Sequence, residues 1–179
     1  MSKLIVDVSY HNGTIDWNKV KAAGIQGAII RCGYGDNIAS QDDKQFKRNA
    51  DECTRLGIPW GVYIYSYAKT TAQAKSEAEH ALRLAAPYKG KMSYPIYYDL
   101  EEKGTESVAV QNAIVFGDII EKAGYWCGIY SGQYWWQKYL GNKLDRFTKW
   151  VARYSSQKPV GISGSYDMWQ YSSSGRVLG

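Results

Sequence analysis

Four times along the sequence, a helix-like stretch ends at glycine and an apolar, strand-like stretch follows at once. The four pairs are VKAAG before IQGAIIRCG, ADECTRLG before IPWGVYIYSY, LAAPYKG before KMSYPIYYDLE, and IIEKAG before YWCGIYS. Glycine is the usual residue at the left-handed position that ends a helix. With the first strand LIVDVS at 4–9, the repeat predicts the order β-α-β-α-β-α-β-α-β. Repeated units of this kind predict a parallel sheet that is covered by helices.

Local signals for helix starts support this order. Asp16 precedes Trp17 as a helix N-cap, and Thr70 forms a capping-box pattern with Gln73. The predicted helix at 43–56 has apolar residues at the spacing i, i+4, i+7, which are Phe46, Ala50 and Cys53. We expect this stripe to be buried.

The length of the chain helps to distinguish an open sheet from a barrel. A full eight-unit barrel takes about 250 residues, whereas this chain has 179 and uses five strands by about residue 130. The later strand-like runs, KWVARYS and SYDMWQYSS, are too close together for a crossover helix between them. We therefore predict an α/β fold of the modified TIM-like barrel type, with five βα units followed by about three strands with little helix. We expect those last strands to lean antiparallel and to close the barrel.

The charge pattern narrows the class of partner. The net charge is +5, but the 22 basic residues are scattered, with no run longer than two. A nucleic-acid surface requires basic residues that gather on one face or along one helix, so we predict no nucleic-acid partner. Attraction to another anionic surface, such as a bacterial wall, is compatible with this charge.

The cysteines and the N-terminus bear on the compartment. Cys32, Cys53 and Cys127 are odd in number and widely spaced, which argues against a disulfide framework and a zinc site. We expect Cys32 and Cys127 to be buried thiols. The start MSKLIVDVSY has no apolar h-region, and no apolar run long enough to cross a membrane follows it. We predict no signal peptide, no membrane span, and synthesis in a reducing cytoplasm.

Carboxylates stand at the ends of two predicted strands. Asp99 and Glu101 end the fourth strand, and Asp7 holds the equivalent place in the first. Residues two apart in a strand share a face, so Tyr97, Asp99 and Glu101 are expected to face the barrel interior, and Glu102 to point away. In parallel α/β folds the carboxyl ends of the strands carry the chemistry. The three acids are therefore expected to converge at one mouth.

Converging carboxylates without histidine or cysteine at metal spacing favour acid–base chemistry over metal binding, and we predict neither a metal nor another cofactor. Mutual repulsion and partial burial keep one acid protonated while another is ionised. This arrangement is typical of enzymes that break glycosidic bonds. A purely structural role, with the pair accepting from backbone amides or a lysine, is the alternative. The pattern is compatible with attack by water, with a covalent enzyme intermediate and with participation of a substrate acetamido group.

The aromatic composition also favours a sugar ligand. The chain has 16 tyrosines and 7 tryptophans but only 3 phenylalanines, and Tyr and Trp combine a flat apolar face with a polar edge. Strand positions near the mouth make several residues candidates for substrate binding. They are Tyr65, Tyr67, Tyr130, Trp169, Tyr171 and, at the end of the second strand, Arg31, for which an ion pair is the alternative role.

Five segments together resemble one enzyme family. They are VDVSYHNGTIDW at 6–17, YYDLE at 97–101, GIYSG at 128–132, KWVARYS at 149–155 and MWQYSSSG at 168–175. In this combination and order the chain resembles the glycoside hydrolase family 25 lysozymes, many of which are bacteriophage endolysins or bacterial autolysins. The resemblance implies a barrel of five βα units plus three strands.

The resemblance also implies an activity and roles for the acids. It implies a lysozyme (N-acetylmuramidase) that cleaves the β-1,4 bond between N-acetylmuramic acid and N-acetylglucosamine in peptidoglycan glycan strands. By motif, Glu101 matches the general acid of the family, and Asp99 and Asp7 match its other active-site carboxylates. We expect a monomer that acts on the bacterial cell wall, as a released endolysin does.

The sequence departs from the family pattern after its last strand. Family members usually continue with a segment that carries one more acid, often V-D-x-N, and many also carry a wall-binding module. We expect residues 1–179 to form a single catalytic domain without these parts. The missing acid keeps a second reading open, a catalytically impaired carbohydrate-binding module. A chitinase-like hydrolase is a third reading, but Tyr94 and Tyr97 replace acids of the longer DxxDxDxE motif.

Overall fold

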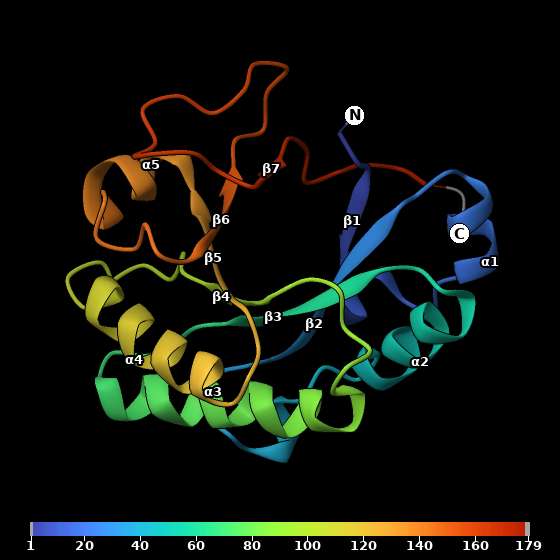
Figure 1. Ribbon diagram of the computed structural model, residues 1–179, viewed down its shortest axis with the longest axis horizontal. Helices are drawn as coiled ribbons and strands as arrows, with labels where there is room; N and C mark the ends of the chain where they lie inside the picture. Colours follow the sequence, from blue (N-terminus) through green and yellow to red (C-terminus); the bar gives the residue numbers. More distant parts are fainter. Residues whose placement is uncertain (1, 178–179) are drawn as a thin grey trace.

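A computed structural model describes residues 2–177 and shows one sheet of seven parallel strands in the order β1-β2-β3-β4-β5-β6-β7. The strands are β1 (Ile5–Val8), β2 (Gly27–Tyr34), β3 (Trp60–Tyr65), β4 (Ile96–Asp99), β5 (Cys127–Gly132), β6 (Thr148–Ala152) and β7 (Met168–Gln170). The sheet curls so that its concave side forms a half-barrel (Figure 1). The predicted α/β class and the modified TIM-like barrel are confirmed.

Helices cover the convex side of the first five strands, and α3 and α4 run side by side there (Figure 1). The α-helices are α1 (Trp17–Ala22), α2 (Phe46–Leu56), α3 (Thr71–Ala85), α4 (Ala109–Lys122) and the single turn α5 (Gln133–Trp135). Other helical turns are η1 (Tyr10–Asn12), η2 (Ala39–Gln41), η3 (Ala86–Tyr88) and the π-helical η4 (Trp136–Leu140). The predicted alternation of strand and helix up to β5 is confirmed.

The helix ends follow from local chemistry. The Asp16 side chain accepts from two backbone amides at the start of α1, and Thr70 Oγ1 accepts from the Gln73 amide at the start of α3. Gly57 ends α2 in the left-handed conformation with φ 66°, where a Cβ is unfavourable. The predicted caps and the predicted glycine stop are therefore confirmed.

The core has two parts, one on each side of the sheet. The larger part lies between the sheet and the helices and includes the predicted α2 stripe, since Phe46, Ala50 and Cys53 are buried. The smaller part fills the concave side with Ile29, Tyr97, Tyr130 and Trp150. The polar groups at the strand ends pack against this smaller core.

The thiols are inert by burial. All three cysteines are free and buried, as predicted for Cys32 and Cys127. Removal from water raises the pKa of the Cys32 thiol to about 12. Among residues 2–177, no helix combines the length and the apolar character needed to cross a membrane.

The last strands differ from the prediction. β6 pairs with β5, and β7 with β6, in the parallel direction, so the expected antiparallel lean is wrong. The segment 153–167 crosses back without a helix and starts β7 in the same direction as β6. Within the described residues β7 pairs only with β6, so the sheet does not close. The expectation about a segment after Gly179 lies outside the described residues.

Candidate active site

An acidic cavity of about 220 Å³ lies on the concave side of the half-barrel. We call it the acidic cavity; its lining residues are Asp7, Tyr63, Asp99, Glu101, Tyr130, Trp150, Tyr154, Gln170 and Ser173. They come from β1, β3, β4, β5, β6 and β7 or from the residues that follow β4, β6 and β7. The three acids predicted from separate parts of the sequence therefore share one hollow.

Strand alternation in β4 places Asp99 in this cavity. Tyr97 belongs to the concave core, whereas Tyr98 and Leu100 pack in the core beneath the helices. β4 ends at Asp99, yet Glu101, two residues later, also lines the cavity, as alternation predicts. Glu102, which was expected to point away from the interior, is absent from the cavity lining. Its Oε2 accepts a hydrogen bond of 2.8 Å from the Tyr65 hydroxyl.

Asp99 is the most buried of the three acids. Only 4% of the residue is exposed, and its Oδ1 has no hydrogen-bond partner within the described residues. Burial, followed by repulsion from Glu101 and Asp7, raises the pKa of Asp99 well above its usual range, and the charge of Arg31 opposes this. Asp99 therefore holds its proton more firmly than an ordinary aspartate.

Glu101 and Asp7 have raised pKa values for partly different reasons. Partial burial of its carboxyl raises the pKa of Glu101, with further contributions from the charges of Glu102 and Asp7. Burial also raises the pKa of Asp7, but a hydrogen bond from Gln170 acts in the opposite direction. Of the three acids, Asp7 is the one whose ionised form receives a donor from another side chain.

The structure places Arg31 beside the cavity. Its Nε donates to Asp43 Oδ2 at 2.9 Å, and its guanidinium carbon lies 4.9 Å from the centroid of the Tyr10 ring. Asp43, which is buried, also accepts from the backbone amide of Tyr10. Arg31 therefore forms an ion pair with Asp43, and not with Asp7.

The aromatic candidates fall into two groups. Tyr130 lines the acidic cavity, whereas Tyr65 and Tyr67, with ring centroids 4.9 Å apart, are outside its lining. The Tyr65 hydroxyl donates to Glu102, the residue after Glu101. Trp169 lies on the opposite face of β7 from Gln170, donates to the Arg153 carbonyl and contacts the exposed Tyr171 ring. Among the five aromatic candidates, Tyr130 therefore lines the cavity. Tyr65 and Tyr67 lie within reach of the charges of Asp99 and Glu102, whereas Trp169 and Tyr171 face away from Gln170.

The cavity lining also includes Tyr63, Trp150, Tyr154, Gln170 and Ser173. The strand pattern offers Tyr154, at the end of the sixth strand, as a possible groove residue and leaves Tyr63 between core packing and stacking, but it does not indicate Trp150, Gln170 or Ser173. Because they are aromatic, Trp169 and Tyr171 are expected on the inward face of the last strand. Gln170 alternates with them and is therefore expected on the outward face. The signal that could have identified it is the pairing of Met168 with Trp150 in adjacent strands, since both belong to the concave side. Gln170, two residues later, must share that side.

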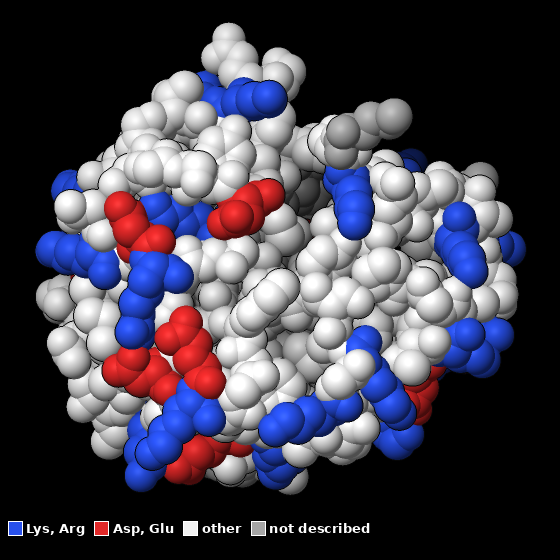
Figure 2. All heavy atoms as spheres, viewed as in Figure 1, with Lys and Arg blue, Asp and Glu red and all other residues white. Residues whose placement is uncertain are grey.

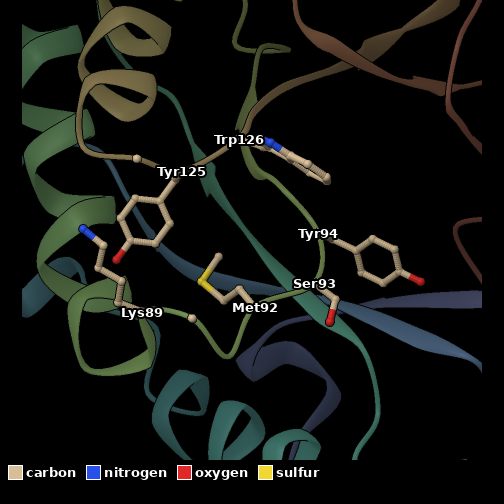
Figure 3. A pocket seen from close by; sticks show the side chains of 8 residues that line it. Lys89, Met92, Ser93, Tyr94, Tyr125 and Trp126 are labelled. Atoms are coloured by element: carbon tan, nitrogen blue, oxygen red, sulfur yellow. The ribbon is translucent and has the colours of Figure 1, made fainter.

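A second hollow, of about 400 Å³, lies at the opposite ends of the strands. Figure 3 shows Tyr94, Tyr125 and Trp126 before β4 and β5, with Lys89 and Met92 nearby. Its lining contains one lysine but neither aspartate, glutamate nor histidine. It therefore has no acid–base pair, and the acidic cavity is the candidate active site.

Charges on the outer surface do not form a recognition patch in the view shown. Figure 2 shows lysine and arginine side chains distributed over this face, with acidic side chains between several of them. Within the described residues no group of three or more His, Cys, Asp or Glu side chains is arranged to hold a metal ion.

Comparison with known proteins shows which proteins this chain resembles. The chain is 24% identical to Lysozyme M1 of Streptomyces globisporus, covering 97% of this chain and 63% of that protein. It is 26% identical to the autolytic lysozyme of Clostridium acetobutylicum, covering 97% and 52%. The solved modular autolysin LytC of Streptococcus pneumoniae superposes with a TM-score of 0.82 at 33% identity, covering 98% and 43%.

The chain thus spans about half to two thirds of the length of these curated relatives. A family model, glycosyl hydrolases family 25, matches residues 6–179. This match includes β1 with Asp7, β4 with Asp99, and the Gln170 strand. The chain therefore belongs to glycosyl hydrolases family 25.

Proposed function

We propose that the protein is a lysozyme that hydrolyses the β-1,4 bond between N-acetylmuramic acid and N-acetylglucosamine in bacterial peptidoglycan. The observation that carries the proposal is the convergence of Asp7, Asp99 and Glu101 in one cavity of a family 25 chain. Two relatives named above are lysozymes, and the pneumococcal autolysin has been solved with a synthetic peptidoglycan ligand. The protein acts as a monomer at the bacterial cell wall.

Glu101 is the proton donor in this proposal. Its residue is exposed at the rim of the cavity, where a leaving glycosidic oxygen can approach, and its raised pKa keeps it protonated to higher pH than an ordinary glutamate. Protonation of the leaving oxygen is the step that general acid catalysis accelerates. Asp99 is too deeply buried to reach a solvent-facing glycosidic oxygen as directly.

Asp7 is the ionised carboxylate in this proposal. Bond cleavage in glycosides builds positive charge on the sugar ring, and a fixed negative charge stabilises that transition state. Asp7 Oδ2 accepts a hydrogen bond from the Gln170 amide, which stabilises the ionised form of Asp7 within the cavity. Tyr130, Tyr65 and Tyr67 offer ring faces for the neighbouring sugars.

Two assays test the function. Turbidity of a suspension of purified bacterial walls should fall on addition of the protein, and colloidal chitin should be cleaved far more slowly. After borohydride reduction and acid hydrolysis of the wall products, the new reducing ends should be muramic acid. Reducing ends that are glucosamine would show a different bond specificity, and binding to walls without any new reducing ends would show a binding module.

A further inference from the structure

The side chain of Gln170 connects three elements across the open side of the half-barrel. Its Nε2 donates to Asp7 Oδ2 at 2.6 Å, from β7 to β1. Its Oε1 accepts from the Tyr130 hydroxyl at 2.7 Å and from the Tyr154 hydroxyl at 3.1 Å. Every polar atom of the amide therefore has at least one partner.

The two hydroxyls determine which way the amide faces. An amide oxygen accepts two hydrogen bonds, and a tyrosine hydroxyl donates one. With both hydroxyls donating to Oε1, the NH₂ group must face Asp7. The opposite orientation would aim Oε1 at the Asp7 carboxylate, where two acceptors meet unless the carboxyl is protonated. The orientation of the amide and the charge of Asp7 are therefore coupled.

From this arrangement we infer that Gln170 is a positioning residue for Asp7. Its amide, oriented by Tyr130 and Tyr154, fixes Asp7 as the anionic member of the three acids and leaves the proton with Asp99 and Glu101. The inference deepens the proposed function, on which its catalytic consequence rests. The other ionisable groups that line the cavity with Asp7 are Asp99 at the end of β4, Glu101 after it, Tyr63 of β3, Tyr130 of β5 and Tyr154 after β6. The charge of Arg31, in β2, acts on Tyr63 and on Asp99.

Those neighbours do not supply the same effect. Asp99 and Glu101 carry or can carry negative charge, which opposes ionisation of Asp7. Burial raises the pKa of Tyr63 and of Tyr130, so both phenols stay neutral. The Arg31 guanidinium is already paired with Asp43. Among the described residues, the Gln170 amide is the side chain that donates a hydrogen bond to the Asp7 carboxylate.

Replacement of Gln170 by methionine tests the inference, because Met keeps the length of the side chain and loses both hydrogen-bonding groups. The pKa of Asp7 should rise, so the acidic limb of the pH–rate profile should move to higher pH by about one unit. Gln170→Glu should restore a donor only where the introduced carboxyl is protonated, so its activity optimum should move to lower pH. Gln137→Met, which removes a surface hydrogen bond to the Val160 carbonyl, is the matched control and should keep the wild-type profile.

Tyr154→Phe separates positioning from packing. Tyr154 is 58% exposed, so the change removes a hydroxyl with little effect on the core. It should move the acidic limb in the same direction as Gln170→Met but less. In the double variant it should add nothing to the shift, because the amide through which it acts is gone. Full additivity of the two shifts would overturn the coupling.

A titration that needs no catalysis keeps the inference independent of the proposed function. The carboxyl carbon of Asp7 can be followed by ¹³C NMR against pH in the wild type and in Gln170→Met. A higher midpoint in the variant supports the inference even if no substrate is cleaved. An unchanged midpoint in a folded variant, or an equal shift in Gln137→Met, overturns it. Absence of wall hydrolysis by the wild type would overturn the proposed function alone.

Discussion

At the scale of single residues, the protonation of Glu101 depends on a carboxylate outside the acidic cavity. Glu102 follows it in the chain, and its charge is the largest neighbouring contribution to the raised pKa of Glu101 after burial. Glu102 is itself held by the hydroxyl of Tyr65. In the proposed function the two adjacent glutamates thus have different tasks, since Glu101 gives a proton and the charge of Glu102 favours its retention.

Glu101→Gln should abolish proton donation while it preserves shape. The variant should lose about 10²–10⁴-fold in the rate of wall hydrolysis, because an amide cannot protonate the leaving oxygen. Binding to insoluble walls should be unchanged, as a co-sedimentation assay can show. Retention of more than a tenth of the wild-type rate would exclude Glu101 as the proton donor.

Glu102→Gln should alter the pH dependence rather than the maximum rate. Loss of the negative charge lowers the pKa of Glu101, so the alkaline limb of the pH–rate profile should move to lower pH, by less than about one unit for a partly exposed group. The Gln oxygen can still accept from Tyr65. Glu106→Gln, a change in the same loop, is the control and should leave that limb in place. A shift to higher pH in Glu102→Gln would contradict the assignment.

At the scale of elements, α4 packs so closely that one of its positions has room for glycine alone. A Cβ at Gly117 would lie 2.3 Å from two ring carbons of Phe147, in the segment between η4 and β6. Phe147 is buried, and the guanidinium carbon of Arg146 lies 4.3 Å from the centroid of its ring. The ring therefore has little space in which to move away.

Gly117→Ala should destabilise the protein although it improves helix propensity. Alanine favours a helix by up to about 1 kcal/mol over glycine, but overpacking typically costs about 1–3 kcal/mol. We expect a net loss of about 1–2 kcal/mol in the free energy of unfolding, measured by urea denaturation. Gly175→Ala, where no atom lies within 4 Å of a built Cβ, should change it by less than about 0.5 kcal/mol. A rise in stability for Gly117→Ala would refute the packing argument.

Elements encoded locally were predictable from the sequence, whereas those set by long segments were not. The stop at Gly57 and the inward position of Asp99 follow from conformational preference and from alternation in β4. The direction of β7 depends on the course of segment 153–167, which is held by hydrogen bonds from Arg153 to the Lys158 carbonyl and from the Val160 amide to Gln133. No local pattern encodes those contacts, so the antiparallel expectation failed.

The same distinction applies to the site. The acids were recognisable because each stands at the end of a strand with a clear apolar pattern. Gln170 and Tyr154 become neighbours of Asp7 only through the curvature of the whole sheet, which sequence alternation does not specify. Glu101 was predictable for the same reason as Asp99, since it lines the cavity although β4 ends two residues earlier.

At the scale of the whole molecule, the acidic cavity opposes folding stability. Burial and mutual repulsion raise the pKa of Asp99, so the folded state disfavours its charge. Below its unfolded pKa the group is neutral in both states and has no such effect. As the pH rises above that value, the unfolded chain ionises first, and the folded state loses stability until Asp99 itself ionises.

Asp99→Asn should therefore raise the melting temperature near neutral pH while it removes activity. Each kcal/mol gained corresponds to a rise of roughly 2–4 °C for a chain of this size. The gain should shrink as the pH falls below about 4, the range in which an unfolded aspartate becomes protonated. Asp118→Asn, which breaks a surface ion pair with Arg146, is the control and should bring no gain. Calorimetry across pH 3–8 measures the melting temperatures of both variants and of the wild type. A rise in melting temperature for Asp99→Asn that is independent of pH would contradict the electrostatic cause.

The hydrogen bond between Asp7 and Gln170 joins residues that are 163 positions apart in the chain. During translation, Asp7 leaves the ribosome early, whereas its partner emerges only after every other strand of the described sheet has been made. Contacts of such sequence separation form late, because closing a long loop costs chain entropy before the contact stabilises anything. A nascent chain therefore carries all three acids before the contact between Asp7 and Gln170 can form. If the proposed function holds, hydrolysis that depends on this contact must wait until the last strand of the described sheet has been synthesised.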